Sequence, residues 1–280
     1  MRRIAILTLL PLLLACHRTD EHAGHTAASE TTATQPPINN PALDPKREAG
    51  PLAEFGNGAR GYLTVPNVGR ASARRPALIV IQEWWGVNDW VRAQADRYSE
   101  QGYVALAVDL YRGKVTSSMD EAHELSRGLP EDRAIADLKA AVDYLSQRDD
   151  VDPQRIGVIG WCLGGGYALA LATNDPRVKA TVINYGRLVT DPDAIAKISG
   201  PVLGNFGGAD RGIPPEDVRK FGAELTKYGK LGDIKIYEGA GHAFMNPDNK
   251  QGYDAAAAQD AQGRIDRFFD RNLRANMPNS

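Results

Sequence analysis

The stretch "RIGVIGWCLGGGYALALA", residues 155–172, places a cysteine within a cluster of glycines, after a strand-like run and before a helix-like run. Gly160, Cys162 and Gly164 have the spacing G-x-C-x-G, which is the nucleophile elbow with cysteine in place of serine. Where a strand turns sharply into a helix, a Cβ two residues before or after the apex would collide with backbone, and glycine avoids this. The side chain of Cys162 should therefore project above the sheet at a helix N-terminus, whose partial positive charge favours a thiolate.

Two other interpretations of Cys162 are open at this point. A lone cysteine among apolar residues is often only a small buried side chain. Glycines between a strand and a helix can also bind phosphate, but the stretch contains neither G-x-x-x-x-G-K-[ST] nor G-x-G-x-x-G. The elbow becomes a catalytic hypothesis only if partner residues occur elsewhere in the chain.

The pattern of apolar residues around the elbow predicts an α/β fold. Short β-branched runs closed by glycine are typical of buried parallel strands. They occur at 77–83, 103–109, 155–161, 180–186, 201–207 and 234–240. Helix-like runs alternate with them at 89–101, 131–147, 163–173, 215–228 and 251–273. This order predicts a mostly parallel central sheet with helices on both faces, and functional residues at the carboxyl ends of its strands.

A cysteine nucleophile needs a base, and histidine is scarce in the predicted domain. His123 lies in a polar, helix-like run and is predicted at the surface, whereas His242 directly follows the last predicted strand. Asp210 follows the strand at 201–207 and lies between nucleophile and base in the chain, as the order Ser…Asp…His of α/β-hydrolases requires. The competing acids have the pattern of solvated helix ends: Asp191, Asp193, Glu216 and Asp217.

The N-terminus predicts export and lipidation. "MRRIAILTLLPLLLAC" has a basic start and an apolar run of signal-peptide length, and it ends in a sequence that resembles the bacterial lipoprotein box. We expect a signal peptide at 1–15, a lipid on Cys16, a flexible polar tether at 16–58 and one domain at 59–276. An ordinary secretory signal with an incidental cysteine is the alternative. Since His17 and not aspartate follows Cys16, we expect the bacterial cell envelope, anchored to the outer membrane in preference to the inner one.

Composition limits which classes of partner the protein is expected to bind. The 280 residues carry a net charge of −2 and are 42% hydrophobic, which suits one large domain without affinity for nucleic acid. Once Cys16 is lipidated, Cys162 is the one remaining thiol and cannot form an internal disulfide.

Several motifs in one order resemble the dienelactone hydrolase (carboxymethylenebutenolidase-like) family of α/β-hydrolases, over residues 75–270. They are "QEWWGVN" (82–88), "DLYRG" (109–113), "GWCLGGG" (160–166), "GAD" (208–210) and "GAGHAF" (239–244). The resemblance implies the α/β-hydrolase fold, hydrolysis of an ester or lactone, and a triad of Cys162, Asp210 and His242, with no metal and no organic cofactor.

The same resemblance adds residues around the triad. Glu83 matches the glutamate of the family's Q-E-x-x-G stretch and is expected to hydrogen-bond the resting thiol and later accept its proton. A structural partner for a buried arginine is the other interpretation of Glu83. The N–H of Leu163, after the nucleophile, and by likeness that of Trp84 are expected to bind the oxyanion. Trp85 and Tyr185 are expected to line the substrate pocket.

The chain departs from the family where substrate is bound. Asn246 stands at a pocket position where the dienelactone enzymes have a carboxylate-binding arginine, and a second such arginine is missing near 116–125. Arg112 and Arg187 could replace them, although both are predicted at the surface. We therefore expect neutral esters or lactones as substrates in preference to anionic ones. The rival hypothesis is a catalytically weak envelope lipoprotein that uses the hydrolase fold for binding.

Overall fold

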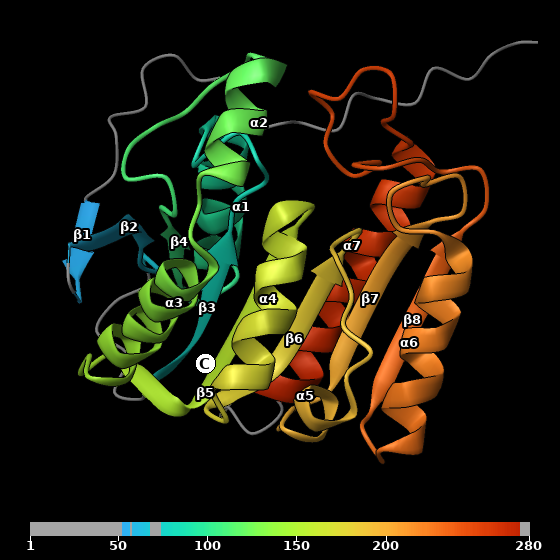
Figure 1. Cartoon of the computed structure of the whole chain (residues 1–280). Coiled ribbons are helices and arrows are strands. Elements are labelled where there is room, and N and C mark those ends of the chain that lie inside the picture. Colours follow the sequence, from blue (N-terminus) through green and yellow to red (C-terminus); the bar gives the residue numbers. More distant parts are fainter. Residues whose placement is uncertain (1–51, 57, 68–73, 275–280) are drawn as a thin grey trace, which may run out of the picture. The chain divides into compact units, whose positions relative to one another are not determined.

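The computed structural model describes residues 52–56, 58–67 and 74–274, and its core is an eight-stranded sheet (Figure 1). The strand order is β1(Leu52–Phe55), β2(Ala59–Thr64), β4(Val104–Val108), β3(Arg75–Ile81), β5(Val151–Trp161), β6(Val178–Asn184), β7(Val202–Gly207) and β8(Gly232–Tyr237). The pairings β1·β2 and β2·β4 are antiparallel, whereas the five pairings from β4·β3 to β7·β8 are parallel. The predicted mostly parallel sheet is therefore confirmed.

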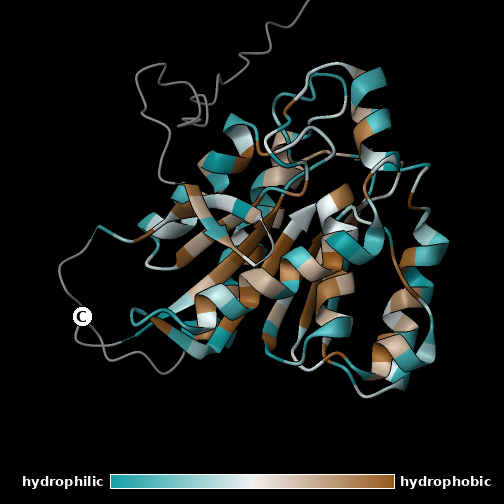
Figure 2. Ribbon diagram, turned by 60° about the vertical axis from the view of Figure 1, so that its left-hand side comes forward, coloured by the Kyte–Doolittle hydropathy of each residue, from teal (hydrophilic) through white to brown (hydrophobic). Residues whose placement is uncertain are grey.

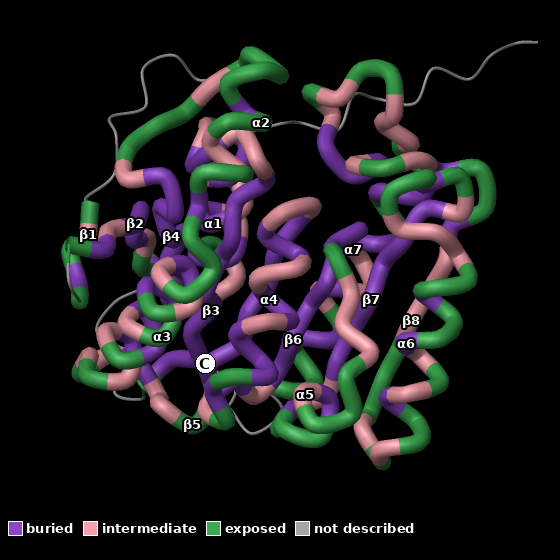
Figure 3. Tube along the Cα trace, in the orientation of Figure 1, coloured by how far each residue is buried: buried purple, intermediate pink, exposed green. Residues whose placement is uncertain are grey.

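Helices cover both faces of the sheet because its strands are apolar on both sides. Leu78 and Val80 of β3 pack in one cluster with α1(Asp89–Glu100) and α7(Ala255–Phe269). Ala77, Ile79 and Ile81 point to the other face, toward α3(Glu131–Ser146) and α4(Leu163–Asn174), and α6(Pro215–Lys227) covers β7 on that side. Figures 2 and 3 show the result, with central strands that are apolar and buried and helices with polar outer faces. Each aliphatic side chain buried in this way contributes about 2 kcal/mol.

Three short elements complete the described part of the chain. The helix α2(Met119–Arg127) lies at the carboxyl edge of the sheet, above β3 in Figure 1, and buries only Ala122. The helix α5(Pro192–Ala196) contributes Ile195 to the cluster around α6. A π-helical turn at Asp270–Arg274 continues α7.

The domain begins earlier than the sequence predicted. β1 lies inside the stretch 16–58 that was predicted as tether, and it pairs with β2 along four residues. Its pattern is weak because it is a short edge strand in which only Phe55 is buried and Leu52 is exposed. The predicted signal peptide, Cys16 and the tether as far as residue 51 lie outside the described residues. No helix in the described ranges is both long and apolar enough to cross a bilayer.

The sharp turn after β5 depends on glycine. A Cβ on Gly160 would overlap the main chain of Gly164, and a Cβ on Gly164 would overlap the carbonyl oxygens of Ile81 and Gln82. These contacts are with backbone, which cannot rotate away as a flexible side chain could. The end of β3 and the first turn of α4 are therefore packed against each other.

We expect Gly164→Ala to lower the free energy of unfolding by about 1–3 kcal/mol because of this overlap. Gly222→Ala is the matched control, since Gly222 lies within α6 and a Cβ there would meet Ile234 at an ordinary 3.7 Å. That change should stabilise the protein by about 0.5–1 kcal/mol. Urea denaturation of the two variants measures both effects, and equal effects would contradict the packing argument.

Candidate active site

Cys162 occupies the apex between β5 and α4 in a conformation that few residues other than glycine adopt, with φ 54° and ψ −116°. Its N–H donates to the carbonyl of Asn184 at 3.0 Å, and its own carbonyl accepts the N–H of Gly165 at 3.1 Å. A non-glycine residue at positive φ costs on the order of 1–3 kcal/mol and persists only where surrounding contacts hold it. The half-buried thiol is thereby presented at the N-terminus of α4.

The three residues predicted as a triad meet at the carboxyl edge of the sheet. Sγ of Cys162 lies 3.1 Å from Nε2 of His242, and Nδ1 of His242 lies 2.7 Å from Oδ2 of Asp210. Asp210 follows β7 and His242 follows β8, so two neighbouring strands deliver acid and base beside the elbow. With its Nδ1–H donating to Asp210, the imidazole can accept the thiol proton at Nε2.

The pKa shifts of Asp210 and His242 agree with a hydrogen bond from the imidazole to the carboxylate. Burial disfavours the charged form of both partners, but their contacts outweigh it. The hydrogen bond from His242, together with the N–H groups of Gly212 and Ile213 at 2.8 and 3.1 Å, lowers the pKa of Asp210. The contacts with Asp210 and Cys162 raise the pKa of His242 to about 10. The site thus stabilises an imidazolium that has taken the proton from sulfur.

Glu83, two residues beyond β3, is buried beneath Cys162 and His242, the pair that is called the dyad from here on. Its Oε1 accepts the hydroxyl of Tyr185 at 3.3 Å, and its Oε2 accepts the side-chain amide of Asn246 at 2.6 Å. Burial raises the pKa of Glu83 to about 7, although the hydrogen bond from Asn246 opposes the shift. The expected hydrogen bond between Glu83 and the resting thiol is therefore not the observed arrangement, in which Cys162 contacts His242.

Asn246 is likewise not a pocket residue. Its side chain is buried, donates to Glu83 and accepts the N–H of Asp248 at 2.9 Å. The prediction placed it at the substrate because it replaces a substrate-binding arginine of the family. In this chain it instead satisfies a buried carboxyl group, which a neutral amide can do.

The raised pKa of Glu83 predicts how stability depends on pH. Because the folded state holds this proton more tightly than the unfolded state, unfolding releases it between pH 4.5 and about 7. The stability of the wild type should therefore fall relative to Glu83→Gln as pH rises through this window, by up to about 3 kcal/mol. Below the window both states are protonated, and above it both are ionised, so the difference levels off.

Denaturant titrations of the wild type and Glu83→Gln at pH 5 and pH 8 give this difference, and the pH effects of groups that do not interact with Glu83 cancel. Asp132→Asn, which removes an exposed carboxylate, is the control and should show no such change. A constant difference between wild type and Glu83→Gln would mean that Glu83 ionises normally.

The two backbone N–H groups proposed for the oxyanion are free in the described part of the chain. Leu163 is the first residue of α4, and its N–H lacks an intrahelical acceptor. Trp84 follows Glu83, and its N–H donates to no acceptor among the described residues. Because the first turn of α4 packs against the backbone of Ile81 and Gln82, the two donors belong to neighbouring chain segments.

The two tryptophans lie outside the pocket wall. The ring of Trp84 contacts those of Trp85 and His123, each with centroids 4.8 Å apart. The carbonyl of Trp85 accepts the N–H of Thr116 at 3.0 Å. The expected pocket role of Trp85 is thus not observed; its ring packs against Trp84, which in turn contacts His123 of α2. His123 is exposed, as predicted.

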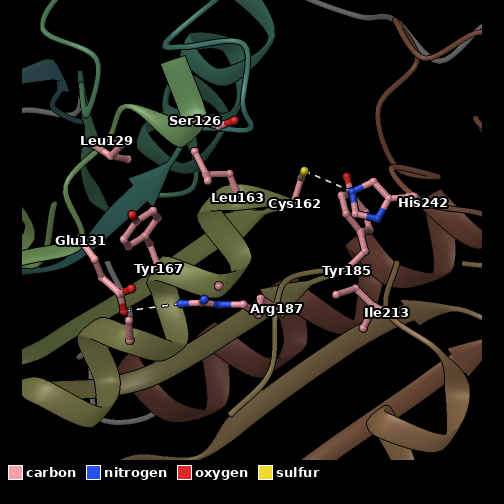
Figure 4. A pocket seen from close by; sticks show the side chains of 12 residues that line it. Ser126, Leu129, Glu131, Cys162, Leu163, Tyr167, Tyr185, Arg187, Ile213 and His242 are labelled. Carbon is pink, nitrogen blue, oxygen red and sulfur yellow. Dashed lines mark hydrogen bonds and ion pairs between the residues drawn. The ribbon is translucent and has the colours of Figure 1, made fainter. Parts of the chain in front are cut away.

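A pocket of about 410 Å³ opens beside the dyad (Figure 4). Its wall is mostly apolar or aromatic and includes Tyr185, as expected. The lining residues are Ser126, Leu129, Glu131, Cys162, Leu163, Gly166, Tyr167, Ala170, Tyr185, Arg187, Ile213 and His242.

The two arginines considered as substitutes differ in position. Arg112 binds Asp137 through one guanidinium nitrogen at 2.7 and 2.8 Å and is not part of the wall. Arg187 is 71% exposed, as the surface prediction implied, but it also forms the wall of the pocket and pairs with Glu131 at 3.4 Å. A cation therefore does lie within reach of bound substrate, at a position the sequence argument set aside.

Sequence reasoning missed a buried polar network beneath the elbow. The side-chain amide of Asn184 donates to the carbonyl of Gly160 at 3.2 Å, and its oxygen accepts from Asn205 at 2.8 Å. Asn205 in turn accepts a hydrogen bond from Arg264. The signal was present, because asparagine is unusual in buried strands. Its presence in β6 and again in β7 marks a hydrogen-bonding requirement at the elbow.

Within the described ranges, no group of three or more His, Cys, Asp or Glu side chains is arranged to hold a metal ion.

Comparison with known proteins agrees with this fold. The model of the dienelactone hydrolase family matches residues 60–273. A protein of Methylorubrum extorquens provisionally named carboxymethylenebutenolidase is 35% identical over an alignment of 208 residues, and the match covers 69% of this chain and 71% of that protein. Protein usf of Aquifex pyrophilus is 32% identical over 235 residues, covering 80% and 99% of the two chains. The crystal structure of a provisionally named dienelactone hydrolase from Klebsiella pneumoniae has a TM-score of 0.69 at 28% identity, covering 77% and 94%.

The sheet with an elbow after β5 has the α/β-hydrolase fold. The chain belongs to the dienelactone hydrolase family.

Proposed function

We propose that this protein hydrolyses a carboxylic ester or lactone with Cys162 as nucleophile, His242 as base and Asp210 as the group that orients the base. The observation that carries the proposal is the continuous contact from sulfur to imidazole to carboxylate at the mouth of a pocket. Family membership supports hydrolysis, and the geometry supports these residues in these roles.

In the first half-reaction, Nε2 of His242 takes the thiol proton while Sγ forms a bond to the carbonyl carbon of the substrate. The negative charge that develops on the carbonyl oxygen is stabilised by the N–H groups of Leu163 and Trp84. The C–O bond then breaks, and the imidazolium gives its proton to the leaving oxygen. An alcohol departs from an ester, whereas a lactone ring opens and its hydroxyl stays on the acyl group.

In the second half-reaction, water attacks the thioester with His242 again as base. The carboxylic acid leaves, and the thiol regains its proton. Glu83 is proposed to influence the dyad through its hydrogen bond with Tyr185. The ring centroid of Tyr185 lies 5.3 Å from that of His242. The chemistry requires no electron donor or acceptor.

A screen of para-nitrophenyl esters with acyl chains of two to eight carbons, together with small lactones, tests the proposal. Cys162→Ala protein, purified in the same way, serves as the blank. Turnover by the wild type above this blank is expected for at least one member. Turnover by neither protein, combined with saturable binding of the same compounds, would favour the rival binding function instead.

We further propose that a lipid on Cys16 anchors the enzyme in the bacterial cell envelope, at the outer membrane. The basic start, the apolar run and the sequence Leu13-Leu14-Ala15-Cys16 support this proposal.

We expect the wild type expressed in a Gram-negative host to sediment with membranes, since more than one acyl chain gives stable anchoring. Cys16→Ser should move it to the soluble fraction or leave it unprocessed. Mass spectrometry of the N-terminal peptide provides the decisive measurement. An unmodified Cys16, or cleavage at another bond, would overturn the anchor.

A further inference from the structure

The pocket wall carries a pair of opposite charges at the end away from the thiol. Among the described residues that line it, Glu131 and Arg187 carry formal charge beyond the Cys162–His242 pair. Figure 4 shows this ion pair across the pocket from the dyad, with Tyr167 beside it. The proposed mechanism uses neither residue.

The pair stands within reach of an acyl chain attached to sulfur. Gly166 follows Cys162 by one turn of α4, which is roughly 6 Å along the helix axis. A Cβ on Gly166 would lie 3.3 Å from the Cβ of Arg187, so the arginine emerges beside that turn. A chain of about six carbons on Cys162 can therefore bring its far end to the pair.

The surroundings favour the pairing of Glu131 with Arg187. Glu131 is the first residue of α3, whose N-terminus has no side-chain cap, and a carboxylate is stabilised there by the free N–H groups. The nearby Arg133 is directed elsewhere, because it donates to the carbonyl of Leu110 at 3.1 Å and to Asp137 at 3.4 Å. Arg187 is left with Glu131 as its partner at 3.4 Å.

We propose that Glu131 is a specificity-determining residue that makes this pocket select esters with an uncharged acyl chain. It does so by neutralising Arg187. An anionic chain end would have to displace Glu131 from Arg187 and then lie beside its carboxylate, whereas a cationic end would meet the guanidinium. An uncharged end leaves the pair intact. This inference rests on the proposed ester hydrolysis and adds the charge class of the substrate.

Two substrates of equal length test it: the para-nitrophenyl half ester of adipic acid, which ends in a carboxylate, and the para-nitrophenyl ester of adipic acid monoamide, which ends in a carboxamide. The quantity measured is kcat/KM for the acid divided by kcat/KM for the amide. We expect a value below one for the full-length wild type. Glu131→Gln should raise it roughly two- to fivefold, and Arg187→Gln should lower it by a similar factor, as for exposed ion pairs.

The double variant Glu131→Gln, Arg187→Gln restores charge balance and should return close to the wild-type ratio. Asp132→Asn is the matched control, because it removes the same charge from the next, exposed residue of α3 that does not line the pocket. Its ratio should stay near that of the wild type. Equal shifts in Glu131→Gln and Asp132→Asn, or a wild-type preference for the acid, would overturn the role of Glu131 while leaving ester hydrolysis established. If the wild type hydrolyses an ester of the screen but neither of these two substrates, the inference alone is overturned; if it hydrolyses no member of the screen either, ester hydrolysis is overturned and the inference with it.

Discussion

Replacing Cys162 with alanine is expected to lower kcat for ester hydrolysis by about 10⁴- to 10⁶-fold, the range seen when the nucleophile of a catalytic triad is removed. Alanine can adopt the same backbone conformation as Cys162, but its methyl group offers no atom that can bond to the carbonyl carbon. His242→Ala should give a loss of similar size, because the thiol proton then has no acceptor at 3.1 Å. The double variant should be scarcely worse than either single one, since the two groups act as a unit.

Steady-state kinetics with the best ester from the screen measures this effect. Circular dichroism of each variant shows whether the fold is retained. His123→Ala is the matched control, since His123 is the other histidine in the described part of the chain and is exposed. If Cys162→Ala keeps activity within tenfold of the wild type, Cys162 is not the nucleophile.

Asp210→Asn should lower kcat by on the order of 10²- to 10⁴-fold. The structure supplies the reason. Oδ1 of Asp210 accepts the N–H groups of Gly212 and Ile213, and these donors would hold the amide oxygen of asparagine in the same place. The amide nitrogen would then face Nδ1 of His242, which would have to accept a hydrogen bond. That tautomer carries its proton on Nε2 and cannot take another from the thiol.

The control is Asp217→Asn, the same change at an exposed position in the first turn of α6. It should leave kcat unchanged. Because the loss in Asp210→Asn comes from the tautomer, the ring nitrogens of His242 should also change their ¹⁵N chemical shifts. Normal turnover combined with unchanged shifts would show that Asp210 does not orient the base.

Local sequence pattern was sufficient for much of the fold. The six parallel strands were predicted near their observed places, because a strand buried on both faces is a continuous apolar run. β1 and β2 were missed because both are short, and β1, at the edge of the sheet, buries only Phe55. The elbow was also predictable, because a strand-to-helix turn with overlapping backbone demands glycine at Gly160 and Gly164.

The residues that form the wall of the pocket were harder to predict from the sequence. Asn246 and Trp85 were expected at the substrate from their places near catalytic motifs. The structure instead directs Asn246 to Glu83 and packs Trp85 on Trp84. Arg187 joins the wall because Gly186 packs against Gly165, which brings the chain after β6 alongside α4. A side chain's direction at the end of a strand depends on such contacts, and one chain segment does not contain them.

By itself, the sequence determined the α/β architecture, the elbow with Cys162 at its apex, and the order in the chain of the residues that meet there. These properties follow from local periodicity, from steric demands of a tight turn, and from the rule that parallel strands end at one edge. Tertiary structure alone decided that Glu83 bonds to Tyr185 and Asn246 instead of the thiol, and that Glu131 pairs with Arg187 in the pocket wall. Those pairings join residues 56 to 163 positions apart. Their contacts exist only once the packed sheet and helices have brought distant backbone segments together.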